Sequence, residues 1–202
     1  MVANRIRLAS KSRRSGTPAN SAVRDGYPPD NAARGCPMSL GRKMLLILMV
    51  TVCAAGCDQA AKSIAKSVLP KASTVSYLGD VVRFQLVHNS GAFMSLGASL
   101  PEAWRKGLFL VGVGALLLGL LLYAVLSRRI ETPGLAIALA MIAGGGLGNI
   151  LDRIAYDGGV IDFIDIGFGP LRTGVFNVAD VVITVGMLLV FAMGWRRRRK
   201  AR

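Results

Sequence analysis

Two aspartates stand in otherwise apolar stretches of the chain, at Val160-Ile161-Asp162-Phe163 and at Phe176-Asn177-Val178-Ala179-Asp180. A carboxylate in apolar surroundings is costly, although Asp180 alone could simply cap the start of a helix. Two carboxylates close together in a sheltered site cannot both ionise, so such a pair offers a general base and a general acid at once. We therefore nominate Asp162 and Asp180 for acid–base chemistry, while their spacing leaves open whether they meet.

Further polar residues stand beside apolar runs, where function and structural pairing are competing interpretations. They are Asp58, Lys62, Asn89, Asn149, Arg153 and Asn177. Asp58 and Lys62 are four residues apart on one helical face, which alone is more typical of a structural ion pair. Asn149 and Arg153 repeat that spacing, and for them a role in a cavity is as plausible as a structural one.

Histidine-based chemistry is hard to build in this chain. His88 is the only histidine, so neither a histidine metal cluster nor a Ser-His-Asp triad is readily assembled. We expect no metal and no cofactor.

Composition excludes several classes of protein. The 202 residues are 52% hydrophobic, yet they include 25 Lys and Arg against 11 Asp and Glu, a formal net charge of +14. Only 18% of residues are charged, which is low for a basic soluble nucleic-acid-binding protein, and three cysteines are too few for a disulfide-built scaffold. The excess charge must be concentrated between apolar segments, and we expect no nucleic-acid partner.

Four apolar segments are long enough to cross a membrane. A helix rises about 1.5 Å per residue, so roughly 20 residues cover a hydrocarbon core of about 30 Å. The expected spans are about 44–62, 107–127, 133–151 and 176–195. The first has the shortest uninterrupted apolar run, which ends at Cys57.

The distribution of charge predicts an orientation. With four spans, both termini and the loop 128–131 share one side, which has 17 Lys and Arg against three acidic residues, whereas the other side has eight of each. Basic residues favour the cytoplasm, so we expect a multi-pass protein of the cytoplasmic (inner) membrane with both termini inside. Residues 1–37, rich in Arg, Ser, Pro and Gly, are expected to form a disordered extension before a domain over 38–202, or to precede the true start at Met38.

Two segments between the spans have the pattern of strands. Residues of about 74–93 are rich in Val, Tyr and Phe and are interrupted by Gly79-Asp80, a hairpin signal, and residues of about 160–168 alternate apolar and polar side chains. The expected fold is therefore a mainly α membrane protein, with four transmembrane helices and a small antiparallel β-sheet on the outer (periplasmic or extracytoplasmic) face.

The first apolar run has a second interpretation. Ala54-Ala55-Gly56-Cys57 after Arg42 and Lys43 resembles the end of a lipoprotein signal peptide, which is cut before the cysteine. Three later spans would make such an anchor superfluous, and Ala54 stands where that motif usually has Leu. We therefore expect Cys53 and Cys57 to face the core, one helical turn apart.

Five short motifs follow one another along the chain: Asp-Gln-x-x-Lys, Asn-x-Gly, Gly-Asn-x-x-Asp-Arg, Val-x-Asp-Phe and Phe-Asn-x-Ala-Asp. On four spans, this order resembles the lipoprotein signal peptidase (signal peptidase II) family over about 165 residues from Met38 to the C-terminus. By that resemblance, Asp162 and Asp180 correspond to the catalytic aspartates. The residues that match the family's supporting positions are Asp58, Lys62, Asn89, Asn149, Arg153 and Asn177. Asp157 and Asp165 are the alternatives for the first aspartate, and the apolar frame around Asp162 favours it.

The resemblance implies an intramembrane aspartyl endopeptidase. Its substrate would be a prolipoprotein, cut just before a diacylglyceryl-modified cysteine, with membrane lipids around a monomeric enzyme and the active site near the outer surface. Competing hypotheses are a small proton-coupled transporter and a structural membrane subunit. A transporter of four short spans without an inverted repeat would be unusual, and a structural subunit would not need its aspartates.

Overall fold

The structure is a computed structural model that describes residues 38–70, 73–91, 99–128, 130 and 132–200. Our expectations for residues 1–37 lie outside the described residues. The description below concerns the compact unit that begins at Cys36.

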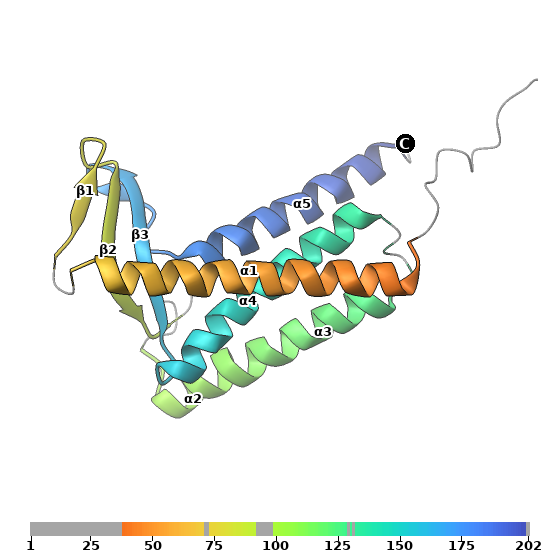
Figure 1. Ribbon diagram of the computed structural model, residues 1–202, viewed down its shortest axis with the longest axis horizontal. Coiled ribbons are helices and arrows are strands. Elements are labelled where there is room, and N and C mark those ends of the chain that lie inside the picture. Colours follow the sequence, from red (N-terminus) through yellow and green to blue (C-terminus); the bar gives the residue numbers. More distant parts are fainter. Residues whose placement is uncertain (1–37, 71–72, 92–98, 129, 131, 201–202) are drawn as a thin grey trace, which may run out of the picture. The chain divides into compact units, whose positions relative to one another are not determined.

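Four long helices form a bundle (Figure 1). Their bounds are α1 (Leu40–Val68), a continuous stack of α2 (Glu102–Lys106), the π-helical η3 (Gly107–Gly112) and α3 (Val113–Leu126), then α4 (Pro133–Ala155) and α5 (Val178–Lys200). Each is long and apolar enough to cross a membrane. The start of α1, the α3–α4 connection and the end of α5 lie at one end of the bundle (Figure 1).

Helix α4 is the centre of the bundle. Half of its most apolar stretch is buried, against 22% in α1, 11% in the stack of α2, η3 and α3, and 11% in α5. Glycines allow this close packing: a Cβ at Gly144 would lie 2.7 Å from the Thr51 carbonyl oxygen in α1, and one at Gly145 would lie 2.7 Å from the Ala179 carbonyl oxygen in α5. The backbones of α1 and α5 are therefore both held close to the same glycine-rich helix.

A four-stranded antiparallel sheet lies at the other end of the bundle (Figure 1). Its strands, in spatial order, are β1 (Val75–Tyr77), β2 (Val82–Asn89), β3 (Val160–Phe168) and β4 (Leu171–Arg172). The β1–β2 turn passes through Leu78, Gly79 and Asp80, all with φ between 54° and 72°. The expected fold class is confirmed, while the side of the membrane that the sheet faces stays a prediction.

The register of the sheet places polar residues next to the bundle. Asn89 at the end of β2 is paired with Val160 at the start of β3. Ile164 of β3 forms a bridge to Phe176, just before α5. The strand that carries Asp162 is thereby fixed directly against the start of the helix that carries Asp180.

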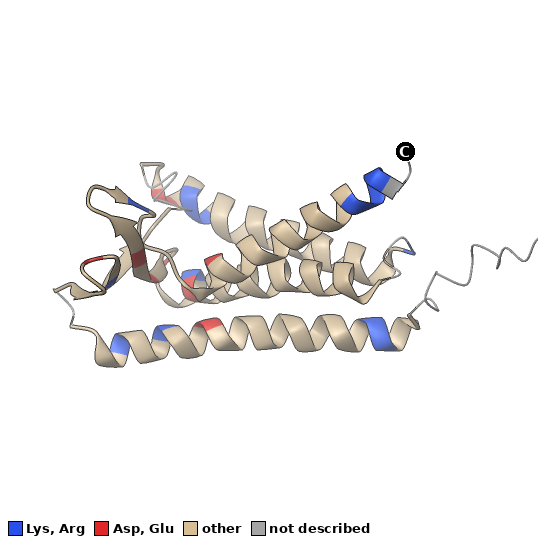
Figure 2. Ribbon diagram, turned by 90° about the horizontal axis from the view of Figure 1, so that it is seen from above, with Lys and Arg blue, Asp and Glu red and all other residues tan. Residues whose placement is uncertain are grey.

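Charged residues are distributed unevenly along the bundle. The acidic residues that Figure 2 colours lie in the half that holds the sheet, whereas basic residues mark the start of α1 and the end of α5. One expectation was wrong: Cys53 and Cys57 do not face the core but are exposed on α1, with their Sγ atoms 4.0 Å apart. Small alanines at positions 54 and 55 face the core instead.

Candidate active site

Asp162 and Asp180 are brought to the same end of the bundle by β3 and α5. Asp162 is the third residue of β3 and is only 3% exposed, whereas Asp180 is half-buried in the first turn of α5. Asp180 lies at the N-terminal end of a long helix, whereas Asp162 lies on a strand. The two carboxylates therefore occupy different environments.

A single side chain, Asn177, contacts both aspartates. Its Nδ2 donates to Oδ1 of Asp162 at 2.6 Å, and its Oδ1 accepts the backbone N–H of Asp180 at 3.0 Å. The backbone N–H of Asn177 in turn donates to Oδ2 of Asp180 at 3.2 Å. This reciprocal pair of hydrogen bonds is a capping box, and it fixes Asp180 relative to Asp162.

Two other asparagines complete the amide shell. Nδ2 of Asn89 donates to the second oxygen of Asp162 at 2.9 Å. Nδ2 of Asn149 lies 3.3 Å from Oδ1 of Asp180, and its Oδ1 accepts from Asn177 at 3.1 Å. Each carboxylate is therefore held by amide groups from different elements, so its orientation is set before any substrate arrives.

Behind the asparagines lies a fully buried ionic cluster. Nζ of Lys62 is 2.7 Å from Asp58 and 2.9 Å from Asp152, and all three side chains are no more than 1% exposed. The same ammonium donates to Oδ1 of Asn149 at 3.1 Å. Lys62 thus links the ionic cluster to the amide that contacts Asp180.

The ionic cluster also fixes the elements that carry the aspartates. Oδ1 of Asp58 accepts the backbone N–H of Ala179 at 2.9 Å, and Oδ2 of Asp152 accepts the backbone N–H of Ile161 at 2.9 Å. Gln59 donates to Oδ1 of Asp152 at 2.9 Å. Each of these backbone groups is adjacent to one aspartate of the site, so α1 and α4 together set the positions of β3 and α5.

Burial controls the ionisation of Asp162. Removal from water raises the pKa of this carboxyl to about 6. The hydrogen bond from Asn89 opposes the shift, the negative charge of Asp180 adds to it, and the Asn177 hydrogen bond opposes it again. Below about pH 6, Asp162 therefore holds its proton.

Arg153 supplies a positive charge on the bundle side of the site. Its guanidinium donates to the carbonyl oxygens of Asn149 at 3.2 Å and Gly91 at 3.1 Å, and it lies 5.4 Å from the centre of the Phe109 ring. Within the described residues, its buried Nε has no hydrogen-bond partner. The guanidinium thus retains one unused donor in the interior.

All eight residues nominated from the sequence lie in this connected network. The two alternatives for the first aspartate do not: Asp157 is 83% exposed and 2.6 Å from Lys106, and Asp165 is 2.6 Å from Arg172. Asp165 is three residues from Asp162 on β3, so it points to the opposite face. His88 is exposed on β2 and packs edge-to-face on Tyr156.

Sequence reasoning did not nominate Gln59 or Asp152 as residues of the site, although Asp152 belongs to the buried ionic cluster. The partner of Asp152 is Lys62 and not its neighbour Arg153, because adjacent residues on a helix point in different directions. A signal was present, since Asp152 follows Asn149 by three residues and lies on a neighbouring part of the helix surface. In the part of the chain that the structure describes, no three His, Cys, Asp or Glu residues are grouped so that they could hold a metal ion.

Known proteins are similar to this chain in both sequence and fold. Residues 50–196 match the family model of signal peptidase (SPase) II. A lipoprotein signal peptidase of Treponema pallidum is 38% identical over 141 residues, covering 67% of this chain and 75% of its own. That of Mycobacterium bovis is 35% identical over 156 residues, covering 74% of this chain and 70% of its own.

A solved bacterial membrane enzyme superimposes with a TM-score of 0.65 over 82% of this chain and 94% of that one. At 22% identity this likeness bears on the fold alone. The sequence matches carry the assignment, because the family model covers well over half of the chain and the relatives exceed 30% identity across most of their length. The chain belongs to the signal peptidase II family.

Proposed function

We propose that this protein is an aspartic endopeptidase that cuts prolipoproteins just before a diacylglyceryl-modified cysteine, with Asp162 and Asp180 as its catalytic pair. The observation that carries the proposal is their connection through Asn177, which touches both groups while Asp162 is buried. A pair of carboxylates that shares one proton can activate water without a covalent intermediate.

The two environments suggest a division of roles. Asp180 at the N-terminus of α5 is the ionised base that takes a proton from water, and the hydroxide formed attacks the scissile carbonyl carbon. Asp162, whose ionisation is opposed by burial, donates its proton to the carbonyl oxygen. When the tetrahedral intermediate collapses, the C–N bond breaks and the proton held by Asp180 passes to the leaving amine of the cysteine. One hydroxyl of the intermediate returns its proton to Asp162 as the new carboxyl group forms, which restores the starting state of the pair.

The remaining residues position these groups. Asn89, Asn149 and Asn177 hold the carboxylates, and Arg153 offers a donor to the peptide groups of the substrate, which need partners in a dry site. Asp58 and Lys62 are positioning residues that act through the backbone of α5 and through Asn149. The enzyme works as a monomer among lipids, without a cofactor or nucleic acid.

The excess of basic residues at one end of the bundle favours an orientation with both termini in the cytoplasm and the catalytic pair near the outer surface. A reporter enzyme that folds only outside the cytoplasm, fused after residue 202, is expected to be inactive. The same reporter fused after residue 70 is expected to be active. Activity of the first fusion and inactivity of the second would reverse the orientation.

The catalytic assignment is tested by Asp162→Asn and Asp180→Asn, each assayed in detergent on a lipidated prolipoprotein. Each should lower the cleavage rate by at least about a thousandfold, because either carboxylate alone lacks its acid or base partner. Asp157→Asn and Asp165→Asn are matched controls, since they remove a carboxylate from the same end of the bundle outside the network.

Both controls should retain activity within a few fold of the wild-type enzyme. Wild-type cleavage by a folded Asp162→Asn or Asp180→Asn variant would overturn the assignment, and it is also the result that a structural membrane subunit predicts.

A further inference from the structure

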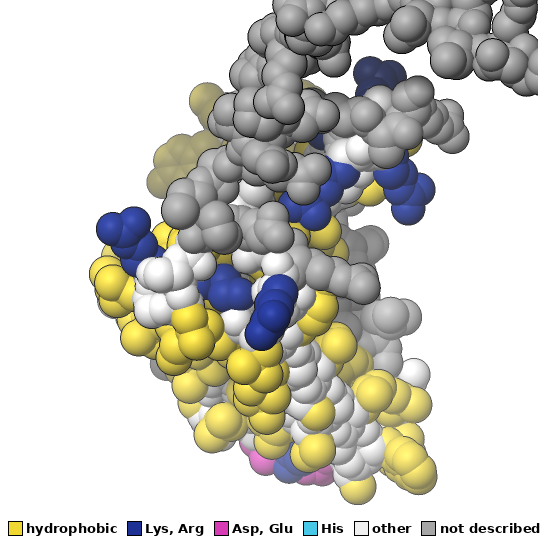
Figure 3. All heavy atoms as spheres, turned by 90° about the vertical axis from the view of Figure 1, so that its right-hand side faces the viewer, with side chains coloured by type: hydrophobic (Ala, Val, Ile, Leu, Met, Phe, Trp, Pro, Cys, Tyr) yellow, Lys and Arg dark blue, Asp and Glu magenta, His cyan; other side chains and the backbone are white. Residues whose placement is uncertain are grey.

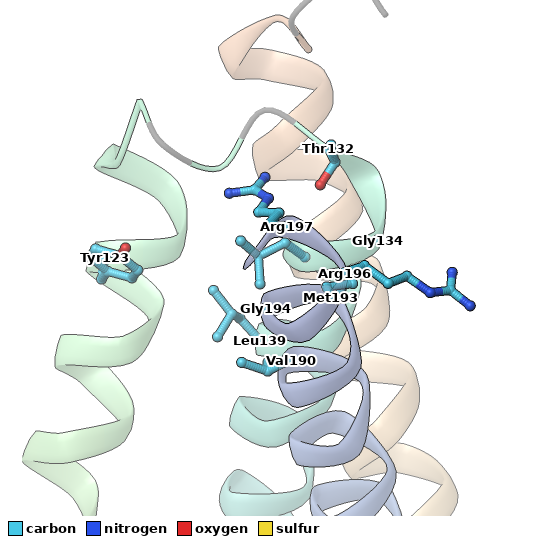
Figure 4. Close-up of a pocket in the computed structure, with 10 residues that line it drawn as sticks. Tyr123, Thr132, Gly134, Leu139, Val190, Met193, Gly194, Arg196 and Arg197 are labelled. Carbon is cyan, nitrogen blue, oxygen red and sulfur yellow. The ribbon is translucent and has the colours of Figure 1, made fainter. Parts of the chain in front are cut away.

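A hollow lies between α3, α4 and α5 at the end of the bundle that is opposite the catalytic pair (Figure 4). Its volume is about 480 Å³, and its wall is mostly apolar. Leu139 of α4 and Val190 of α5 form its floor, and Tyr123 of α3 stands across from them (Figure 4). Because these three helices are candidate spans, the floor lies at the depth of lipid acyl chains.

Two arginines form the rim of this groove. Both Arg196 and Arg197 line it, and Figure 4 shows the guanidinium of Arg197 extending toward α3 above Leu139, whereas that of Arg196 extends to the other side of α5. Trp195 precedes them in the sequence, and tryptophan is typical of the membrane–water interface. Arg197 therefore stands at headgroup level above the apolar groove, and Arg196 lies at the same level on the other side of α5.

The charge of this end is complementary to an anion. Among the described residues here, every charged side chain is basic, and blue side chains are gathered on this face in Figure 3. Neither Arg196 nor Arg197 has an acidic partner within the described part of the chain. By contrast, the guanidinium of Arg199 stacks on the Trp195 ring at 5.6 Å.

We propose that the α3–α4–α5 groove is a binding site for one anionic phospholipid. Arg197 donates to the phosphate, Arg196 adds positive charge from the other side of α5, and one acyl chain lies along Leu139 and Val190. A guanidinium matches two phosphate oxygens at once, and arginine can therefore hold a headgroup in a fixed orientation. The site lies away from the catalytic pair, so its occupancy does not depend on the proposed chemistry.

The test is a titration of delipidated full-length protein in neutral detergent, with native mass spectrometry to count bound lipids. The two probes are palmitoyl-oleoyl phosphatidylglycerol and phosphatidylcholine with the same acyl chains. The wild-type protein should retain one phosphatidylglycerol at concentrations where phosphatidylcholine is not retained. Arg196→Gln/Arg197→Gln should weaken this binding by roughly tenfold or more.

Arg198→Gln/Arg199→Gln is the matched control, because it removes the same charge from the same helix without touching the groove. It should keep the bound lipid. An equal loss in this control would overturn the proposal, since a diffuse basic surface would then suffice, and so would equal retention of the two lipids by the wild-type protein.

A second variant tests the groove rather than the charge. Gly194 borders the groove, and a Cβ there would meet no atom within 4 Å, so Gly194→Phe can fill the space without strain. This variant keeps all arginines and should still lose the bound phosphatidylglycerol. Retained binding in Gly194→Phe would exclude the groove as the site, and Asp162→Asn should bind the lipid like the wild-type protein.

Discussion

Asp58, in the first helix, accepts the backbone N–H of Ala179 at 2.9 Å, at the start of the last helix. The two residues are 121 positions apart in the sequence. The second oxygen of Asp58 lies 2.7 Å from Lys62, so the residue is at once a helix cap and half of a buried ion pair. Asp180 follows Ala179 directly, and its position therefore depends on α1.

Removing Asp58 should be strongly destabilising. Asp58→Ala leaves the buried Lys62 ammonium with one carboxylate and Ala179 with an unpaired N–H, and breaking a buried pair in this way costs about 3–5 kcal/mol. Thermal unfolding in detergent should show a melting temperature lower by several degrees or more. Cleavage should fall even below the melting transition, because the first turn of α5 is no longer fixed.

Glu102→Ala is the matched control, because Glu102 and Lys106 form an ion pair with the same four-residue spacing in which the glutamate is 60% exposed. Exposed pairs contribute little to stability, so its melting temperature should stay close to that of the wild-type protein. Equal losses in the two variants would mean that the buried cluster has no special role.

Activity should depend on pH through Asp162. Burial raises the pKa of this carboxyl to about 6, and the negative charge of Asp180 contributes to the rise, so Asp162 loses its proton as the pH passes this value. We therefore expect kcat/KM to fall as the pH rises above about 6. Asn89 donates to the charged form, so Asn89→Ala should raise this pKa and move the falling limb to higher pH.

Asp157→Asn is the control for the pH profile. The ammonium of Lys106 lowers the pKa of Asp157 well below this range, and that carboxyl does not contact the site. Its pH profile should overlay that of the wild-type enzyme. A limb that stays in place in Asn89→Ala would show that the titrating group is not Asp162.

The free energy of unfolding should also depend on pH through Asp162. The pKa of this carboxyl is near 4 in the unfolded chain and about 6 in the folded protein. Its contribution to stability is therefore fully present below about pH 4 and is lost as the pH rises through about 6. Asp162→Asn has no carboxyl to ionise at this position. At pH 7.5 the variant should therefore be more stable than the wild-type protein by up to about 3 kcal/mol, and it should melt at a higher temperature. At pH 4.5 the advantage should largely disappear, and a pH-independent difference would contradict the assignment.

The sequence was sufficient where the signal is local. Long apolar runs are recognisable from hydropathy alone, and the four helices were predicted for that reason. The helix that holds the second expected span begins earlier, at Glu102, and its first turn carries charges that pair with each other on the helix surface. Counting charged residues in the sequence does not distinguish a charged first turn of a helix from a charged loop.

Helix packing decided what the sequence left open. Asp152 pairs with Lys62 across two helices, and Cys53 and Cys57 point away from the core, because glycines of α4 and not the cysteine face determine how α1 approaches. The connection between Asp162 and Asp180 likewise requires the bridge between Ile164 and Phe176. Such contacts join residues that are far apart in the sequence, so their separation along the chain does not predict whether they meet.

The glycines of α4 give the last prediction. A Cβ at Gly145 would lie 2.7 Å from the Ala179 carbonyl oxygen, and a backbone atom has little freedom to move. Gly145→Ala should therefore push the start of α5 outward, at a cost of about 1–3 kcal/mol in stability and with a loss of activity through Asp180.

Gly114→Ala is the matched control, because a Cβ at Gly114 of α3 would meet no atom within 4 Å. Alanine is the better helix former by roughly 1 kcal/mol, so this variant should melt at or above the wild-type temperature and keep full activity. Melting curves and cleavage rates of Gly145→Ala and Gly114→Ala test this prediction. If Gly145→Ala cleaves like Gly114→Ala, the close contact between α4 and α5 does not set the position of Asp180.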